Sequence, residues 1–376
     1  MKPELLANLS FRGKIQQTYE ELQKIRRGTM VAPLALNGVR DINLVQYLGS
    51  KFPEGCTNKD GSFDMNHVYS ELGINPDVMT VANLIDLDQD SKWLTPEIFR
   101  DSIRKGFRTS PFYNQLIAAS VNVAQPQVNM PYIDLSDAEP KPLEEAENIS
   151  KGTVSYGNKT VEIKKEGIGI DITYEALQYT TINLMTIFLQ DIGVKLGHRL
   201  NGKLIDIAIN GDQADLSQNA AVIGVENVVL GLQYSDILRL WIRGSLLGRY
   251  YTSMIANETM AGTIMALAEF KDKNQGTTEK TLAVNGTLPS QAKLFVSTKV
   301  PDNQIIFVDP SFAFVQLTAS PLLVEGEKIV SKQIESAYAT ITTGFANVFR
   351  EARVILDVSL PFAGNGFPDW MNSDSI

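Results

Sequence analysis

The sequence predicts an α+β fold, because its helical and strand-like segments occupy separate runs of the chain. Residues 167–173, "GIGIDIT", alternate strictly between isoleucine and a glycine or polar residue, which is typical of a strand. Apolar residues then recur every four positions, which predicts one long helix over about 174–209. Two amphipathic helices follow in 234–272, and the chain closes with an alternating strand pattern at 354–358.

The composition argues against several classes of function. The chain of 376 residues has a net charge of −9, which disfavours tight wrapping of nucleic acid. Cys56 is the only cysteine and the two histidines are His67 and His198, so neither an internal disulfide nor a zinc site is expected. No apolar run reaches the roughly 18 residues of a membrane span, and no signal-peptide pattern opens the chain. We therefore expect a protein without membrane contact, made inside the cell.

The first 110 residues predict an extended arm with local structure but no core of its own. Residues 3–27 have helical apolar spacing, and 1–27 hold six basic and three acidic residues. A solvated helix docked on its own domain explains this excess better than a nucleic-acid arm, because short charge runs are weak signals. Residues 28–110 predict short helices and loops punctuated by proline and glycine.

Residues 86–97 resemble a calcium-binding loop. Carboxylates stand at positions 1, 3, 5 and 12 of that pattern, namely Asp86, Asp88, Asp90 and Glu97. Ser91 replaces the glycine of the sharp turn, and Pro96 precedes the glutamate. The competing interpretation is a helix that begins at Pro96 with Thr95 as its N-cap, and we favour it because such carboxylates are common in acidic proteins.

Residues 126–166 predict a ribbon that cannot bury itself. The segment is rich in charge and has few large apolar side chains. Alternating runs flank Gly157–Asn158, which predicts a hairpin turn at that pair. An isolated two-stranded ribbon is marginally stable in water, so we expect this one to lie on a neighbouring molecule.

The Gly-x-Gly of "GIGIDIT" raises the question of a phosphate site. A nucleotide motif needs a third glycine, or a lysine and a hydroxyl at the helix that follows, and these are absent. We instead expect Gly167 and Gly169 to form a bare face that another backbone can approach. Thr173 is predicted to cap the long helix, with Glu175 in its first turn.

The long helix is predicted to present a single apolar stripe, made of Leu184, Phe188, Ile192, Leu196, Leu200, Leu204 and Ala208. Gly193, Gly197 and Gly202 each lower its helix propensity by about 1 kcal/mol. These glycines indicate either close packing against another backbone or a bend, and both readings stay open.

No active site is predicted. The chain has no nucleophile elbow, and only His67 or His198 could serve a catalytic triad. The adjacent pair Glu144–Glu145 lies in a polar stretch and is expected to be solvated charge. We expect no enzymatic activity and no cofactor.

The order of segments carries a family resemblance. The chain presents an arm, an acidic ribbon, a strand ending in "GIDIT", a very long helix closing on "LIDIAINGD", a mixed domain and a return strand. This order resembles the major capsid proteins of tailed bacteriophages, which have the Hong Kong 97-type fold. The resemblance covers roughly 110–360, and its most specific part is "EIKKEGIGIDITYEALQYTTINLMTIFLQDIGVKLGHRLNGKLIDIAINGD".

The resemblance implies a peripheral domain built on a spine helix and a sheet, an axial domain, an extended β-hairpin loop and a long N-terminal arm. It divides the chain into an arm (1–110), a first peripheral segment (111–128), the extended loop (129–166), the peripheral domain with the spine helix (167–220), the axial domain (221–340), a peripheral return strand (341–362) and a tail (363–376).

The resemblance also implies a homo-oligomer of pentamers and hexamers that self-assembles into an icosahedral head shell around phage double-stranded DNA. Implied partners are a portal protein, the scaffold or decoration proteins of some members, and DNA held by weak non-specific contact. The protein is expected in the virion capsid after synthesis in the host cytoplasm. The residues assigned to assembly are Gly167, Gly169, Leu184, Phe188, Ile192 and Leu196.

Some members of the family join a loop lysine to an asparagine of a neighbouring subunit. The candidates here are Lys151, Lys159 and Asn347, although surface lysines are mostly solvated. Two other functions stay open. One is an encapsulin-like nanocompartment shell, against which the hundred-residue arm counts, and the other is a calcium-binding or hydrolytic protein built around 86–97.

Overall fold

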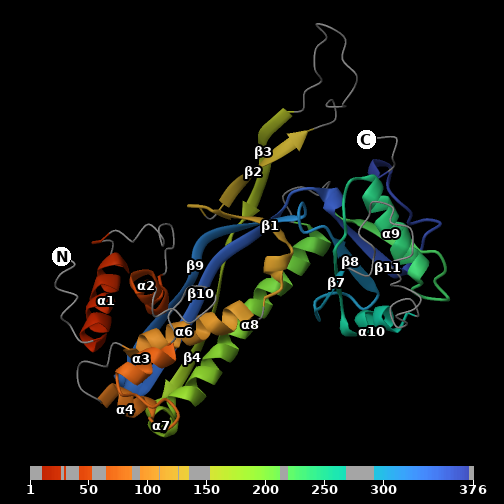
Figure 1. Ribbon diagram of the computed structural model, residues 1–376. Coiled ribbons are helices and arrows are strands. Elements are labelled where there is room, and N and C mark those ends of the chain that lie inside the picture. Colours follow the sequence, from red (N-terminus) through yellow and green to blue (C-terminus); the bar gives the residue numbers. More distant parts are fainter. Residues whose placement is uncertain are drawn as a thin grey trace. The chain divides into compact units, whose positions relative to one another are not determined.

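The computed structural model describes residues 11–26, 29–30, 42–52, 65–86, 94–109, 111–125, 127–134, 153–211, 219–267 and 292–371 (Figure 1). The helices and sheets of this part confirm the α+β fold class. The chain divides into two compact units: unit 1 comprises 1–111, 165–198 and 320–342, and unit 2 comprises 112–164, 199–319 and 343–376. Within the described ranges, no helix combines the length and apolar character that crossing a bilayer requires.

The described part of the arm is helical, as predicted. Its helices are α1 (Phe11–Arg26), α2 (Leu44–Lys51), α3 (Met65–Glu71), α4 (Val81–Asp86) and α6 (Leu94–Thr109). Helix α1 buries Ile15 and Leu22, and its Glu21 carboxylate accepts a hydrogen bond from the Tyr47 hydroxyl of α2 (3.2 Å). The expected docking of this helix on its own chain is therefore confirmed.

The arm helices also contribute buried side chains to unit 1. Leu44, Leu48 and Val68 are fully buried, and so are Leu94 and Ile103 of α6. Little in the sequence indicated this burial, because a helix as short as α2, which buries Leu44, Val45, Tyr47 and Leu48, spans too few residues to produce a long periodic pattern.

Helix α6 lies alongside the first part of α8 (Ile182–Asn210) in unit 1 (Figure 1). A Cβ atom on Gly106 would stand 2.0 Å from the carbonyl oxygen of Gln190, and one on Gly193 would stand 2.0 Å from that of Ile103. The two backbones therefore touch directly. Close packing, and not a bend, accounts for the glycine at 193.

The helix expected over 174–209 is in fact two helices, α7 (Tyr174–Tyr179) and α8. Thr180 between them has an extended backbone, with φ −93° and ψ 126°. Thr181 forms an antiparallel β-bridge with Thr80 of the arm. The Val81 amide donates to the Thr180 carbonyl, and the Ile182 amide donates to the Met79 carbonyl, both at 3.1 Å. The arm thus supplies hydrogen bonds that a continuous helix would otherwise make within itself.

The described strands form three sheets. One has the order β1-β9-β10-β4, the second β5-β11-β8-β6-β7, and the third is the two-stranded ribbon β2-β3. Their bounds are β1 (Ile117–Asn122), β2 (Gln127–Asp134), β3 (Thr153–Glu162), β4 (Lys164–Thr173), β5 (Ala221–Val225), β6 (Ser253–Ala256), β7 (Lys293–Val296), β8 (Gln304–Val308), β9 (Phe314–Ile329), β10 (Ile334–Asn347) and β11 (Arg353–Pro361).

The core of unit 2 lies between the five-stranded sheet and two helices, α9 (Tyr234–Leu246) and α10 (Glu258–Ala266), which fall within the predicted helical region. Strand β11 pairs antiparallel with β8 and parallel with β5. The sheet and the helices interleave their buried side chains, among them Ile223, Ile305, Phe307, Val354 and Leu356 from strands and Ile237, Leu240, Met260 and Ile264 from helices. The predicted strand at 354–358 is therefore confirmed as part of β11, which is buried over 353–357.

Candidate assembly surfaces

The ribbon β2-β3 begins on a packed base. Val161 and Ile163 are buried against Leu317 and Ala346, and Val128 packs on the same cluster. The two strands are antiparallel, pairing from Gln127 with Glu162 to Asp134 with Thr153. In the described residues, β2 and β3 pair with no other strand.

The predicted turn at Gly157–Asn158 is wrong, because both residues lie inside β3. Asn129 pairs with Thr160, whereas Pro131 pairs with Tyr156. Residues 157–159 therefore stand opposite the single residue 130, which makes a bulge with two extra residues in β3. Glycine and asparagine adopt irregular backbone angles at low cost, so Gly157–Asn158 suits a bulge as well as a turn. Pro131 on the facing strand has no amide to donate, which is also compatible with interrupted pairing at the bulge.

Strand β4 has the two faces that its sequence predicts. Ile172 is buried, whereas Gly167 and Gly169 lie on the exposed face. A Cβ atom on Gly169 would stand 2.6 Å from Cδ1 of Tyr338, and one on Gly167 would stand 3.0 Å from Cγ2 of Thr340. Side chains of β10 therefore lie nearest to the bare face, and the backbone carbonyl oxygens of Ala339 and Ala337 follow at 3.3 and 3.5 Å.

The end of β4 starts the first helix of the spine region. The Thr173 Oγ1 accepts a hydrogen bond from the amide of Ala176 (3.2 Å), and Glu175 lies in the first turn of α7. The predicted cap is therefore confirmed. Its signal was local, because the threonine, the acidic residue and the end of the alternation fall within a few residues of each other.

Helix α8 does not bury the predicted stripe as one face. Leu184 and Phe188 are exposed, whereas Ile192 and Leu196 are buried. Residues four apart advance by about 40° around a helix with 3.6 residues per turn, so Leu184 and Phe188 at the start of the run wind off the core. From Ile192 onward the predicted stripe is buried, through Leu196, Leu200, Leu204 and Ala208, and Met185 and Leu189 continue the buried face toward the start of the helix.

The residues that wind off the core leave an apolar patch on unit 1, which we call the spine patch. It consists of Tyr179, Leu184, Ile187 and Phe188, all of them exposed. The spacing of the last three, at i, i+3 and i+4, places them on one side of α8. Exposed apolar residues gathered on one face, in contrast to scattered ones, indicate a surface that another molecule covers.

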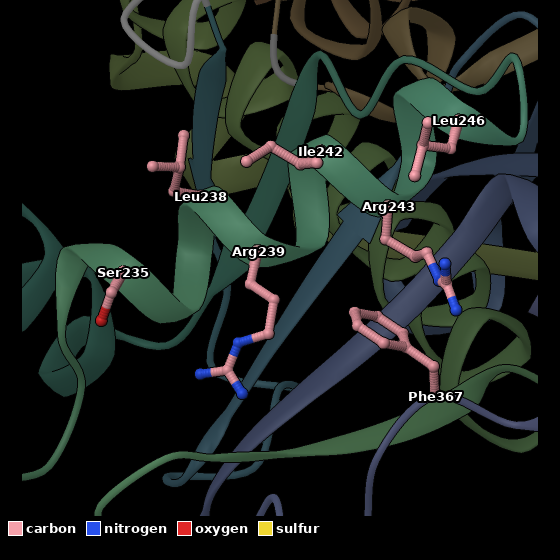
Figure 2. Close-up of a pocket in the computed structure, with 7 residues that line it drawn as sticks. All are labelled: Ser235, Leu238, Arg239, Ile242, Arg243, Leu246 and Phe367. Carbon is pink, nitrogen blue, oxygen red and sulfur yellow. The ribbon is translucent and has the colours of Figure 1, made fainter. Parts of the chain in front are cut away.

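Helix α9 of unit 2 carries a second apolar row that the sequence analysis did not single out. An open groove of about 440 Å³ runs along it, lined by Ser235, Leu238, Arg239, Ile242, Arg243, Leu246 and Phe367. Figure 2 shows Leu238, Ile242 and Leu246 in a row along one side of α9, with both arginines on the other side. The i, i+4, i+8 spacing of Leu238, Ile242 and Leu246 could have revealed this second row, because it is distinct from the buried face that holds Ile237 and Leu240.

The arginines of the α9 groove are held in fixed positions. The Arg239 guanidinium lies 4.2 Å from the ring centroid of Phe362 and pairs with Asp236 and, at 3.6 Å, with Glu226. The Arg243 guanidinium lies 5.0 Å from the ring centroid of Phe367. Both guanidinium groups of this wall therefore lie on phenylalanine rings, and that of Arg239 is also paired with two carboxylates.

A smaller hollow in unit 1, of about 400 Å³, is lined by Ala82, Asn83, Tyr174, Leu177, Gln178, Lys328 and Glu335. The Lys328 ammonium lies 5.2 Å from the ring centroid of Tyr174. Burial raises the pKa of the Glu335 carboxyl, and the charge of Lys328 partly opposes that rise. The hollow thus holds a carboxyl group that loses hydration when the chain folds.

Of the calcium candidates, Asp86 and Glu97 lie in the described residues, among which no cluster of three or more potential metal ligands occurs. Glu97 is buried in α6 and pairs with Arg100 at 2.7 Å, and a second nitrogen of that arginine donates to the Val324 carbonyl (3.0 Å). Asp86 ends α4, and Asp88 and Asp90 lie outside the described residues. Helix α6 begins at Leu94, so the prediction that Thr95 caps a helix starting at Pro96 is wrong by two residues.

Of the cross-link candidates, the structure describes the burial of Asn347 alone. Asn347 ends β10 and is 1% exposed. Lys159 lies in the bulged part of β3, and Lys151 lies outside the described residues. The linkage itself stays a prediction.

Comparisons with known proteins give likeness in structure and none in sequence. No protein-family model and no curated protein sequence matches the chain. A virus-like particle from Pyrococcus furiosus aligns with a TM-score of 0.45 at 9% identity, over 69% of this chain and 97% of that one. The capsid of a native GTA particle gives 0.46 at 16% identity, over 65% and 88%, and the mature capsid of bacteriophage PhiM1 gives 0.46 at 10%, over 67% and 88%. The solved structures that this chain resembles are thus capsids and a virus-like particle.

Proposed function

We propose that this chain is a shell-forming capsid protein, many copies of which close into the icosahedral head of a tailed phage. The observation that carries the proposal is the ribbon β2-β3, which is anchored at its base and pairs with no other described strand. Two strands alone are marginally stable in water, so a ribbon of this length is expected to be completed by another molecule. In a shell, that molecule is a further copy of the chain.

The exposed apolar surfaces support the same proposal. Both compact units have well-formed cores, yet each displays a row of large apolar side chains: the spine patch on α7 and α8 and the groove on α9. A monomer would gain nothing from either surface and would risk aggregation. Closed assemblies cover such surfaces in every copy, because each copy presents the same surfaces to its neighbours.

The finer assignments follow from the resemblance in segment order. In this proposal, residues 129–166 are the loop that lies on the adjacent subunit, α8 is the spine helix, and 221–340 forms the axial domain at the centre of pentamers and hexamers. The net charge of −9 suits an enclosed genome, because an acidic wall lets DNA move while a basic wall would hold it.

Electron microscopy of the purified full-length chain tests the proposal. We expect closed or tubular particles, with or without a co-expressed scaffold protein. A chain that stays monomeric under every assembly condition overturns the proposal. Nuclease-protected DNA inside particles purified from infected or induced cells supports the phage head, whereas particles filled with protein support the nanocompartment.

A calcium titration tests the alternative function at 86–97. Binding to the native state alone would raise the unfolding temperature. We expect no shift, because Glu97, the proposed bidentate ligand, is already engaged with Arg100.

A further inference from the structure

A short segment of the arm, residues 75–81, is hydrogen-bonded to the start of α8, and we call it the arm strap. The Met79 carbonyl accepts a hydrogen bond from the amide of Ile182 at 3.1 Å. The Pro76 carbonyl accepts one from the amide of Asn183 at 3.2 Å. The first amides of a helix have no partner within that helix. The strap therefore caps α8 with the backbone of a distant segment.

The strap also holds the residue that separates α7 from α8. The Val81 amide donates to the Thr180 carbonyl at 3.1 Å, and Thr180 has an extended backbone, with φ −93° and ψ 126°. The side-chain amide of Asn183 donates to the Asp77 carboxylate. In a continuous helix, the Thr180 carbonyl would instead accept from the amide of Leu184. The strap thus occupies a backbone group that helix continuity requires.

A continuous helix through this junction would satisfy the same groups without the strap. Each amide of an α-helix donates to the carbonyl four residues earlier. The Ile182 amide would donate to the Gln178 carbonyl, and the Asn183 amide would donate to that of Tyr179. Residues 174–186 contain neither glycine nor proline, so local preference does not oppose a helix there. The junction exchanges one set of hydrogen bonds for another, which is the property of a two-state element.

Joining the two helices would change the apolar surface of unit 1. Leu177 is 3% exposed and lines the hollow that it shares with Ala82 of α4. In one continuous helix, Leu177 would lie within about 20° of both Leu184 and Phe188 around the axis, because residues follow each other at about 100°. Leu177 would therefore extend the spine patch toward the start of the helix.

We propose that the arm strap is a reversible switch of the spine patch. When the strap is docked, α7 and α8 are separate helices and Leu177 is covered. When the strap is released, the two helices join and Leu177 adds to the exposed apolar row. Backbone hydrogen bonds add little net stability because water competes for them, so the exchange is reversible. The inference rests on the proposed shell function only where it treats the spine patch as a surface that a further copy covers.

Two proline substitutions bias the switch in opposite directions. Thr181→Pro should keep the helices apart, because no described group accepts from the Thr181 amide and Thr180 already has the extended backbone that proline requires before it. In a continuous helix, the same proline would clash with the Leu177 carbonyl. Val81→Pro should release the strap, because it removes the donor to Thr180 at the first residue of α4, where proline is tolerated.

Spin labels at two exposed positions report the state of the junction. In a Cys56→Ser background, full-length chains carry Glu175→Cys on α7 and Lys195→Cys on α8, and electron paramagnetic resonance measures the distance between the labels. At 1.5 Å per residue, a continuous helix sets the two backbone positions about 30 Å apart. Thr181→Pro supplies the reference distance of the separated helices. We expect the parent chain to match this reference and Val81→Pro to add a population near 30 Å.

Hydrogen exchange distinguishes joining from unfolding. The Thr181 amide has no acceptor among the described residues, whereas a continuous helix would bond it to the Leu177 carbonyl. Peptides that span 174–186 should therefore gain protection in the Val81→Pro chain.

Two further variants control the experiment. A chain with both Val81→Pro and Thr181→Pro should give only the reference distance, because proline at 181 prevents joining. Asp77→Ala removes the exposed acceptor of the Asn183 side chain. It repeats the release if Val81→Pro fails to fold, as judged by circular dichroism.

The opposite results overturn the inference. A folded release variant that keeps the reference distance, or that loses protection over 174–186, shows that the helices do not join. Particle yield by sedimentation tests the link to assembly, and Thr181→Pro should lose the particles that the parent chain forms. An unchanged yield refutes regulation of the spine patch by the strap. A parent chain that forms no particles refutes the shell, while the label distances still decide whether the switch exists.

Discussion

The ring of Tyr338 lies over Gly169, in the space that any side chain at that position would fill. The pair joins β10 to β4, and the next facing pair along the strands is Asp171 with Ser336, whose hydroxyl donates to the carboxylate at 2.6 Å. An aromatic ring over a strand glycine protects backbone that the glycine would leave bare.

The contact between Tyr338 and Gly169 predicts that the effect of Gly169→Val on stability changes sign when the ring is removed. Gly169→Val should destabilise the chain by about 1–2 kcal/mol, because the new side chain must displace the ring. In a Tyr338→Ala background, the same change should be neutral or stabilising, because valine then contributes only its strand preference. Urea unfolding of the four chains of this cycle measures the coupling. Equal effects in both backgrounds would show that the ring is not what the glycine accommodates.

Two glycines of α8 should respond oppositely to the same substitution. Gly193→Ala should lower the free energy of unfolding by about 3 kcal/mol, because its Cβ would overlap the α6 backbone. Gly202→Ala should raise it by about 1 kcal/mol, because the Cβ there meets only the flexible side chain of Lys299 at 3.3 Å. Thermal or urea unfolding measures both, and a stabilising Gly193→Ala would contradict the close contact of the helices.

Adjacent residues of α8 should separate folding from assembly. Leu189 is fully buried, and Leu189→Asp should prevent folding, because it buries an unpaired carboxylate. Phe188 is 48% exposed, and Phe188→Asp should change the free energy of unfolding by no more than about 0.5 kcal/mol. Particle yield by sedimentation should nevertheless fall for Phe188→Asp. An unchanged yield would remove the spine patch from the assembly surface.

Glu335→Gln should stabilise the chain in a pH-dependent way. Burial raises the pKa of this carboxyl in the folded chain above its ordinary value of 4.5, so ionisation costs stability above that raised pKa. The variant should therefore unfold at a higher temperature than the parent chain at pH 7. Below pH 4.5 both states hold the proton and the difference should disappear. An equal gain in unfolding temperature at every pH in this range would show that the stabilisation has a cause other than the ionisation of Glu335.

Features encoded by neighbouring residues were predictable from the sequence. The β4 alternation and the Thr173 cap depend on contacts within a few positions, and both match the structure. The break at Thr180 was not predictable in this way, because it depends on Thr80, a hundred residues earlier in the chain. Local helix preference favoured continuity, and pairing with the arm overrode it.

The assembly surfaces were harder to predict than the core. A search for one apolar face per helix finds the buried side of α9 and passes over Leu238, Ile242 and Leu246 on another side. On α8, the spacing of four grouped Phe188 with Ile192, although only the second is buried. Sequence periodicity identifies apolar residues, but it does not say which of them a chain covers by itself.

The bulge at 157–159 of β3, which holds two extra residues, affects how the ribbon can change during evolution. Side chains on a strand alternate with a period of two, so inserting or removing two residues keeps every later side chain on its original face. Bulges also bend and twist a strand. The direction of the strands beyond the bulge can therefore change by paired insertions or deletions, while the faces of their side chains and the buried base at Val161 and Ile163 stay the same.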